Sequence, residues 1–136
     1  SLTKEEKSDI LAFFEKQLKD RVSGVSDSKR LVDSPCSLVT PKDGMTAQME
    51  KMMKMMDQKF KGEKRNMEVN MSHPIIQNLS VILQKDKKHP FLKDSVEQLY
   101  DNSMLVEGLL EDPVQVLSRF QKFMESASAY ELEKLS

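Results

Sequence analysis

The sequence predicts an α+β domain, with a small three-stranded sheet packed with helices and a C-terminal half that forms a helical bundle. In the first half, short stretches rich in Val and Ser alternate with helical patterns. After residue 73, apolar residues recur at steps of three and four, the spacing of one face of a helix. The order of helix, two strands, helix, strand and three helices is typical of this class. The 136 residues suffice for one domain, which we divide into a sheet-containing half (1–72), a helical half (73–126) and a tail (127–136).

The sheet-containing half begins with a helix over residues 4–20, because Thr3 and Glu6 fit a capping box. Its apolar face comprises Ile10, Leu11, Phe14 and Leu18. Three strands are predicted, at residues 21–27, 36–40 and 66–70. The last is predicted because Met67 and Val69 alternate with polar residues. The basic stretch 59–65 contains a glycine and predicts a solvated loop. A nucleic-acid patch is less favoured there, since the stretch has only one aromatic residue.

Residues 44–56 hold six of the ten methionines and predict a helix with a methionine face. Met45, Met49, Met52 and Met56 share that face, with Met53 and Met55 at its edges and Glu50, Lys51 and Lys54 opposite. Unbranched thioethers adapt to irregular surfaces, so the face suits a site that binds many shapes. The alternative is a core helix, which the composition alone favours because apolar stripes at helical spacing are usually buried.

The helical half has three start signals, His73-Pro74, His89-Pro90 and Asp112-Pro113, and each predicts a capped helix with Pro at its first position. The histidines are therefore read as caps and not as metal ligands. The apolar positions are Ile75, Ile76, Leu79, Ile82 and Leu83 in the first helix, Leu92, Val96, Leu99, Tyr100, Val106 and Leu110 in the second, and Val116, Leu117, Phe120, Phe123 and Met124 in the third. The tail has weak helical character.

The last two helices form a hairpin across Gly108–Pro113, and each carries an apolar stripe. A two-helix hairpin offers too little partner surface to bury both stripes by itself. A second copy of the chain would cover them in a four-helix bundle. The alternative is that the sheet half covers them, and from the residues alone both stay open.

Composition and motifs exclude several classes of function. The net charge of −1 gives no field that favours nucleic acid or an anionic membrane, and no apolar run is long enough for a membrane span. No signal peptide is visible. There is no phosphate-binding glycine loop and no HExxH, so neither a cofactor nor a metal is expected. The single cysteine, Cys36, lies in a predicted strand and is expected to be a buried, inert thiol. No catalytic residue is assigned.

Several segments together resemble the C-terminal domain of the 90-kDa heat-shock chaperone family, in particular its bacterial form. The matching pieces are Val22-Ser23-x-Val25, Arg30-Leu31-x-Asp33-Ser34-Pro35, Gly44-Met45 through Gln48-Met49-x-Lys51-Met52, Glu68-x-Asn70, His73-Pro74 and Glu111-Asp112-Pro113. Their order and spacing agree over residues 10–124. The RL-x-DSP and M-x-x-QM-x-K pieces are fairly specific in combination.

The resemblance implies a stress-response chaperone that is a homodimer and binds unfolded or partly folded client proteins. Clients would be held by the methionine helix, through Met45, Met49, Met52, Met53 and Met56. The dimer would be a four-helix bundle built from the last two helices of each chain, through Leu99, Val106, Leu109, Leu110, Val116, Leu117, Phe120, Phe123 and Met124. This reverses the preference for a core helix at residues 44–56.

The resemblance also implies that ATP and Mg²⁺ are bound in an N-terminal domain that is missing here, so the segment itself is not expected to be an enzyme. The expected location is the cytoplasm, or alternatively a eukaryotic organelle. The chain ends YELEKLS and lacks the acidic pentapeptide of eukaryotic cytosolic relatives, so tetratricopeptide cochaperones are not expected to dock there. The rival hypothesis is a monomeric helical adaptor whose methionine groove holds one partner helix.

Overall fold

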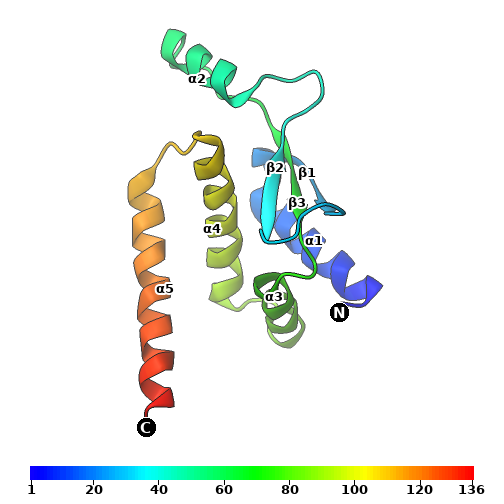
Figure 1. Ribbon diagram of the computed structural model, residues 1–136, viewed down its shortest axis with the longest axis vertical. Coiled ribbons are helices and arrows are strands. Elements are labelled where there is room, and N and C mark those ends of the chain that lie inside the picture. The colour runs from blue at the N-terminus through cyan, green and yellow to red at the C-terminus, as the bar shows by residue number, and fades with distance from the viewer.

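The computed structural model describes all 136 residues and confirms the α+β class (Figure 1). The elements follow the chain as α1 (Lys4–Leu18), a 3-10 turn η1 (Lys19–Arg21), β1 (Val22–Asp27), β2 (Cys36–Val39), α2 (Ala47–Met56), β3 (Arg65–Val69), α3 (Pro74–Lys85), α4 (Pro90–Glu107) and α5 (Pro113–Lys134). All predicted helices and strands are therefore present in the predicted order.

The three strands form a mixed sheet in the order β1-β3-β2, with β3 parallel to β1 and antiparallel to β2. Along β3, buried and half-buried residues alternate, as the predicted alternation of Met67 and Val69 requires. The other side of β3 is polar, where the Asn66 amide donates to Ser26 Oγ at 2.9 Å. The sheet thus has one face packed in the core and one face that is polar.

The core lies between the sheet and helices α1, α3 and α4. The predicted capping box of α1 is confirmed, since Glu6 N–H donates to Thr3 Oγ1 and Thr3 N–H donates to the Glu6 carboxylate. The buried residues of this cluster include Ile10, Phe14 and Leu18 from α1, Met67 and Val69 from β3, Ile76 and Leu79 from α3, and Leu92, Val96 and Leu99 from α4. Most predicted apolar positions of α1, α3 and the first half of α4 thus pack inside one chain.

The helix ends carry the predicted caps. His73 Nδ1 and His89 Nδ1 each accept a hydrogen bond from the backbone N–H two residues later, at 3.1 Å, and Asp112 Oδ1 accepts from Gln115 N–H at 3.3 Å. Helix α4 stops at Gly108, whose left-handed backbone (φ 72°) is the usual end of a helix. The chain can therefore reverse there and form the α4–α5 hairpin.

Cys36 is buried in β2, as predicted, and burial raises the pKa of its thiol to about 12. Such a thiol stays protonated and unreactive near neutral pH.

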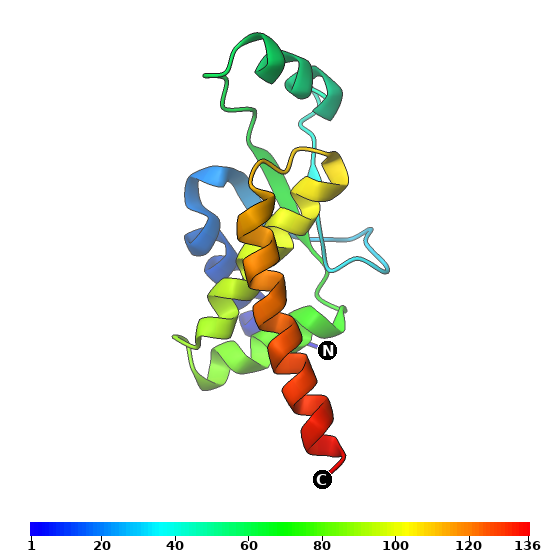
Figure 2. The ribbon, with the colours of Figure 1, turned by 90° about the vertical axis from the view of Figure 1, so that its left-hand side faces the viewer.

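Several boundaries differ from the prediction. Helix α1 ends at Leu18 and not at residue 20, and α2 begins at Ala47 and not at residue 44. Arg65, part of the predicted solvated loop, is the first residue of β3 and is buried. The segment expected to be a weakly helical tail continues α5 through Lys134. Figure 2 shows this end of α5 projecting past the rest of the chain. No helix in the structure combines the length and the apolar character that crossing a membrane requires.

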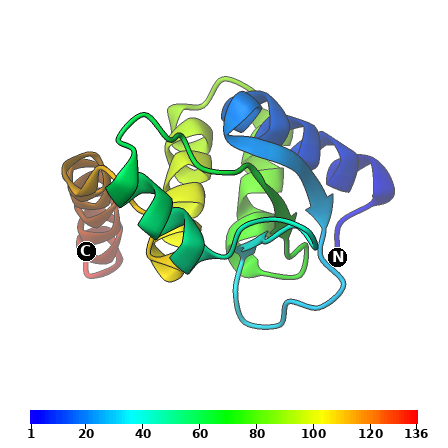
Figure 3. The same ribbon diagram turned by 90° about the horizontal axis from the view of Figure 1, so that it is seen from above.

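Helices α2 and α5 lie outside the core. Figures 1 and 3 show α2 as a separate helix beyond the end of α4 that is joined to α5, while α5 runs beside α4. Each of these helices has a single buried residue, and in both cases that residue is charged: Glu50 in α2 and Arg119 in α5.

Candidate functional site

Helix α2 contacts the body of the protein through its polar side. It begins at Thr46, whose Oγ1 accepts a hydrogen bond from Met49 N–H at 3.2 Å. Its buried residue, Glu50, belongs to the side that the helical wheel placed opposite the methionines. In an ordinary surface helix the apolar side faces the core. The orientation of α2 is the reverse.

The carboxylate of Glu50 forms a buried ion pair with Arg65 of β3. Arg65 Nη1 lies 3.1 Å from Glu50 Oε2, and the two side chains are only 3% and 2% exposed. The second Glu50 oxygen accepts from Glu63 N–H. Gly62 leaves room for this carboxylate, because a side chain there would place its Cβ 2.3 Å from Glu50 Oε1. The segment before β3 is therefore shaped around Glu50.

Arg65 also fixes the segment that enters α2. Its Nη2 donates to the carbonyl oxygen of Met45 at 3.3 Å, and Glu63 Oε2 accepts from Met45 N–H at 2.6 Å. The two chain segments on either side of α2 are thus joined to each other beneath the helix.

The other end of α2 contacts the turn between α4 and α5. Lys54 forms an ion pair with Glu111. The Nζ of Lys51 lies beside Gly108, where a Cβ would come within 2.4 Å of it. Helix α2 therefore rests on the bend of the hairpin predicted to form the dimer.

The methionines of α2 point away from these contacts. Five methionines of the helix are exposed to solvent: Met49 (51%), Met52 (57%), Met53 (37%), Met55 (86%) and Met56 (80%). Met45, just before the helix, is half-buried. Within one chain the methionine helix is therefore not a core helix, and the interpretation as core packing is wrong. Whether these residues contact clients stays a prediction.

Helix α5 packs against α4 mainly through polar and aromatic contacts. Arg119 Nη1 donates to Gln98 Oε1 at 3.0 Å and lies 3.1 Å from Asp101 Oδ2. Further along, the rings of Phe91 and Phe123 meet edge to face, with centroids 5.6 Å apart. These contacts hold the hairpin together and use one residue of the predicted apolar stripe of α5, Phe123.

The predicted dimer residues separate into three groups by exposure. Leu99 and Leu109 are buried inside the chain and are not available to a partner, which corrects their assignment as contact residues. Leu99 packs in the core cluster formed with the sheet half, as the alternative interpretation expected. Leu109 lies in the turn after α4, outside that cluster. The half-buried residues are Leu110, Val116 and Phe123, and the exposed ones are Val106, Leu117, Phe120 and Met124.

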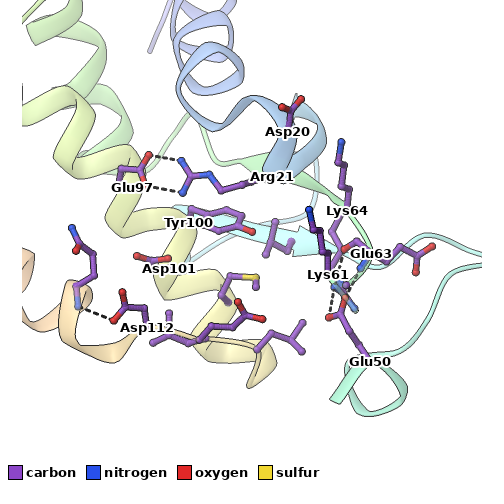
Figure 4. A pocket seen from close by; sticks show the side chains of 18 of the residues that line it. Asp20, Arg21, Glu50, Lys61, Glu63, Lys64, Glu97, Tyr100, Asp101 and Asp112 are labelled. Atoms are coloured by element: carbon purple, nitrogen blue, oxygen red, sulfur yellow. Dashed lines mark hydrogen bonds and ion pairs between the residues drawn. The ribbon is translucent and has the colours of Figure 1, made fainter. Parts of the chain in front are cut away.

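A groove of about 1160 Å³ lies between α2, α4, the start of α5 and the segment before β3. Figure 4 shows Arg21 reaching across it to Glu97, with Tyr100 beside them and Glu50 on the opposite wall. Burial acts to raise the pKa of Glu97, but hydrogen bonds from Arg21 and Gln17 outweigh it, so the pKa lies below its usual value. The hydrogen bond to Glu97 raises the pKa of Arg21.

Most other groove residues are also charged and of both signs. No group of three or more potential metal ligands occurs anywhere in the structure. The groove is a polar junction between α2 and the hairpin, and no catalytic arrangement of side chains is visible in it.

Sequence reasoning missed the charged residues that position the two outer helices. Glu50 and Arg65 are fifteen residues apart in different elements, and no spacing rule pairs them. Arg119 is a charged residue within the apolar stripe of the last helix. This interruption was a sequence signal for a polar contact of that helix. It marks the side of α5 that faces α4.

Two pieces of sequence that carry the family resemblance meet in the structure. Arg30 Nε lies 3.0 Å from Glu68 Oε1, and the Asn70 amide donates to the carbonyl oxygen of Ser34 at 3.1 Å. The RL-x-DSP loop is thus held by the E-x-N segment at the end of β3. The family model described as "Hsp90 protein" matches residues 1–135. The chain belongs to the Hsp90 protein family.

Three curated relatives of this Hsp90 chain are bacterial proteins named "Chaperone protein HtpG". The protein from Chlorobium chlorochromatii (strain CaD3) is 39% identical over 119 residues, which cover 88% of this chain and 19% of the relative. Those from Oleidesulfovibrio alaskensis and Geobacter sulfurreducens are 35% and 40% identical, over 93% and 79% of this chain. Membership of the Hsp90 family supports a chaperone function for this chain. The chain spans about a fifth of the length of these relatives.

Proposed function

We propose that this Hsp90 chain is the homodimerisation and client-contact module of an ATP-dependent molecular chaperone. The observation that carries the proposal is the reversed orientation of α2. Because Glu50 and Lys54 attach the helix to the body, five thioether side chains are left facing outward. An exposed apolar surface of this kind is typical of a protein-binding site.

The side chains of this surface favour weak and broad binding. Methionine has three flexible side-chain bonds and a polarizable sulfur, so a row of methionines can adapt to different apolar partners. A surface that adapts in this way does not select one shape. Unfolded or partly folded proteins, which expose varied apolar segments, are the partners that fit it.

The dimer is proposed from the outer face of α5. Leu117, Phe120 and Met124 are more than half exposed in the single chain, and they follow one another at steps of three and four. Burying such a side chain contributes about 1.5–3 kcal/mol. Packing the α4–α5 hairpin of one chain against that of another would cover this stripe in a four-helix bundle.

The remaining parts of the proposal follow from the family. ATP and Mg²⁺ would bind in another part of a longer chaperone, and this segment would need no cofactor and perform no catalysis. A dimer would keep two distant nucleotide domains near each other and raise their effective concentration. Cytoplasmic location is part of the same proposal, with neither nucleic acid nor membrane as a partner.

The experiment replaces Met49 and Met52 with Lys in the full chain. Because α2 is attached by its opposite side, the double variant should fold and associate like the wild type. Its ability to prevent aggregation of a heat-denatured reporter protein should fall several-fold. The matched control replaces Ile75 and Val81 of α3 with Lys, since these apolar residues are similarly exposed at 43% and 48%. Unchanged client holding in the α2 variant would exclude α2 as the client surface.

The rival function, a monomeric adaptor that holds one partner helix, shares the methionine surface but not the dimer. It predicts a solution mass equal to one chain and saturable binding of a single partner. Light scattering and a competition test with two unrelated unfolded proteins separate the two functions.

A further inference from the structure

We propose that the methionine surface of α2 is a reversible oxidation site, at which peroxide converts the exposed thioethers to sulfoxides and so releases clients. The site itself follows from exposure and packing alone. Its effect on clients rests on the proposed function.

Exposure separates the methionines of α2 from those of the core. Met55 and Met56 are 86% and 80% exposed, whereas Met67 and Met71 are 0% and 6% exposed. A peroxide molecule in solution can therefore reach the sulfur atoms of α2 directly, while the core sulfurs are shielded by neighbouring side chains. Oxidation of methionine follows access to the sulfur, so the five exposed residues of α2 should react before Met67 and Met71. Met124 of α5 is 58% exposed in the single chain, but the proposed dimer would cover it.

The packing of α2 allows this reaction to occur without unfolding. In a helix that packs by its apolar side, a sulfoxide would place a polar group in the core and break the fold. Here the buried contacts are made by Glu50 with Arg65 and Glu63, and Lys54 pairs with Glu111 at the bend of the hairpin. None of these contacts uses a thioether. Oxidation would therefore change the surface of α2 and leave its attachment intact.

The step is an oxygen transfer. A sulfur lone pair attacks one oxygen of hydrogen peroxide, the O–O bond breaks and an S–O bond forms. The proton on the transferred oxygen passes to the departing hydroxide, which leaves as water. Sulfur is oxidised by two electrons and the peroxide is reduced. Methionine sulfoxide reductases reverse the change with a thiol reductant, which returns the thioether and releases water. The sulfoxide is polar and accepts hydrogen bonds from water, so burying it against an apolar client is unfavourable.

The large number of methionines in α2 increases the effect of oxidation on client binding. Five of the ten residues of α2 are methionines, so partial oxidation already places several polar groups within three turns of one helix. We expect client affinity to fall at least about tenfold when most of these residues are oxidised, because each apolar side chain withdrawn from a client contact weakens it.

The experiment treats the full chain with hydrogen peroxide, measures sulfoxide at each methionine by peptide mass spectrometry, and measures client holding before and after. The control variant replaces Met49, Met52, Met53, Met55 and Met56 with Leu, which keeps the apolar character and helix propensity but cannot form a sulfoxide. We expect α2 to oxidise at least about tenfold faster than Met67 and Met71. Client holding should fall in the wild type and should not change in the Leu variant. It should recover in the wild type when the reductases for both sulfoxide epimers are added together with a thiol reductant.

Two results would overturn the inference. One is oxidation of the α2 methionines no faster than that of the core methionines. The other is equal loss of client holding in the wild type and the Leu variant, which would place the sensitive group elsewhere. If the five-residue variant fails to fold, the double variant Met55→Leu and Met56→Leu removes the two most exposed sulfur atoms. It should then lose less client holding on oxidation than the wild type, and an equal loss would overturn the inference.

A third result separates this inference from the proposed function. If α2 is oxidised selectively and client holding stays unchanged, the Met49→Lys and Met52→Lys variant decides between the two. Loss of client holding in that variant means that only the oxidation switch is wrong. Unchanged client holding in the oxidised wild type and in the Lys variant means that α2 is not the client surface.

Discussion

Arg65 of β3 and Glu50 of α2 form an ion pair that is almost completely buried, with 3.1 Å between Nη1 and Oε2. This pair joins the central strand of the sheet to a helix that otherwise lies outside the core. It determines which side of α2 faces the protein, and hence that the methionines face solvent. A charged contact is therefore the reason that an apolar surface stays open.

Replacing Glu50 with Gln should release α2 from the body. The change leaves the Arg65 guanidinium buried without its counter-charge, which costs up to about 3–5 kcal/mol. Because α2 can swing outward and let water reach Arg65, most of this loss should appear as local opening. Amide hydrogen exchange of residues 47–56 should become much faster, while exchange in α1 and α3 changes little.

The control for this prediction is Lys54→Gln. Its partner Glu111 is largely exposed, so the pair contributes at most about 1 kcal/mol. Exchange in α2 should then change only slightly. Equal exchange in the wild type and the Glu50→Gln variant would show that the buried ion pair does not hold α2.

Charges on the outer face of α5 should prevent association. Leu117→Glu together with Phe120→Glu would place two unpaired carboxylates inside the proposed bundle, at a cost of several kcal/mol. Both residues are exposed in the single chain, so the fold should be retained. Circular dichroism checks the fold, and sedimentation should show monomers.

The matched control for this dimer prediction is Ile75→Glu with Val81→Glu, which adds the same charge at exposed apolar positions of α3. That variant should remain a dimer. Sedimentation of the α5 variant as a dimer would exclude its stripe as the interface.

Stability should depend on Glu97 at acid pH. The native pKa of Glu97 is lowered from 4.5, because hydrogen bonds from Arg21 and Gln17 outweigh the effect of burial. The unfolded chain then takes up the proton first as the pH falls. The stabilisation is therefore fully present above pH 4.5 and is lost as the pH falls through the lowered native pKa.

A Glu97→Gln variant removes this contribution. It should be less stable than the wild type at neutral pH, and the difference should shrink as the pH falls below 4.5. Urea unfolding of both proteins at a series of pH values measures the difference. A gap that stays constant over the whole range would contradict the role of Glu97.

Local patterns predicted the elements well because their causes are local. The capping box of Thr3 and Glu6, the histidine caps of α3 and α4, and the alternation in β3 all depend on residues a few positions apart. The stripe of α1 was predicted for the same reason, since its apolar residues pack on one continuous core.

The orientation of α2 could not be predicted in this way. A helical wheel shows that one side is apolar, but it does not show which side faces the protein. That choice is made here by the pairing of Glu50 with Arg65, residues from different elements. The burial of Leu99 within the chain likewise depends on how α4 lies against the sheet half, which is a tertiary relationship.

We propose that a second copy of the chain covers the apolar stripe of α5, whereas the methionine surface of α2 stays open to solvent and clients. The solution mass of the chain by light scattering tests it most directly. We predict twice the chain mass of 15.7 kDa at micromolar concentration. A mass of one chain at all accessible concentrations would contradict the account.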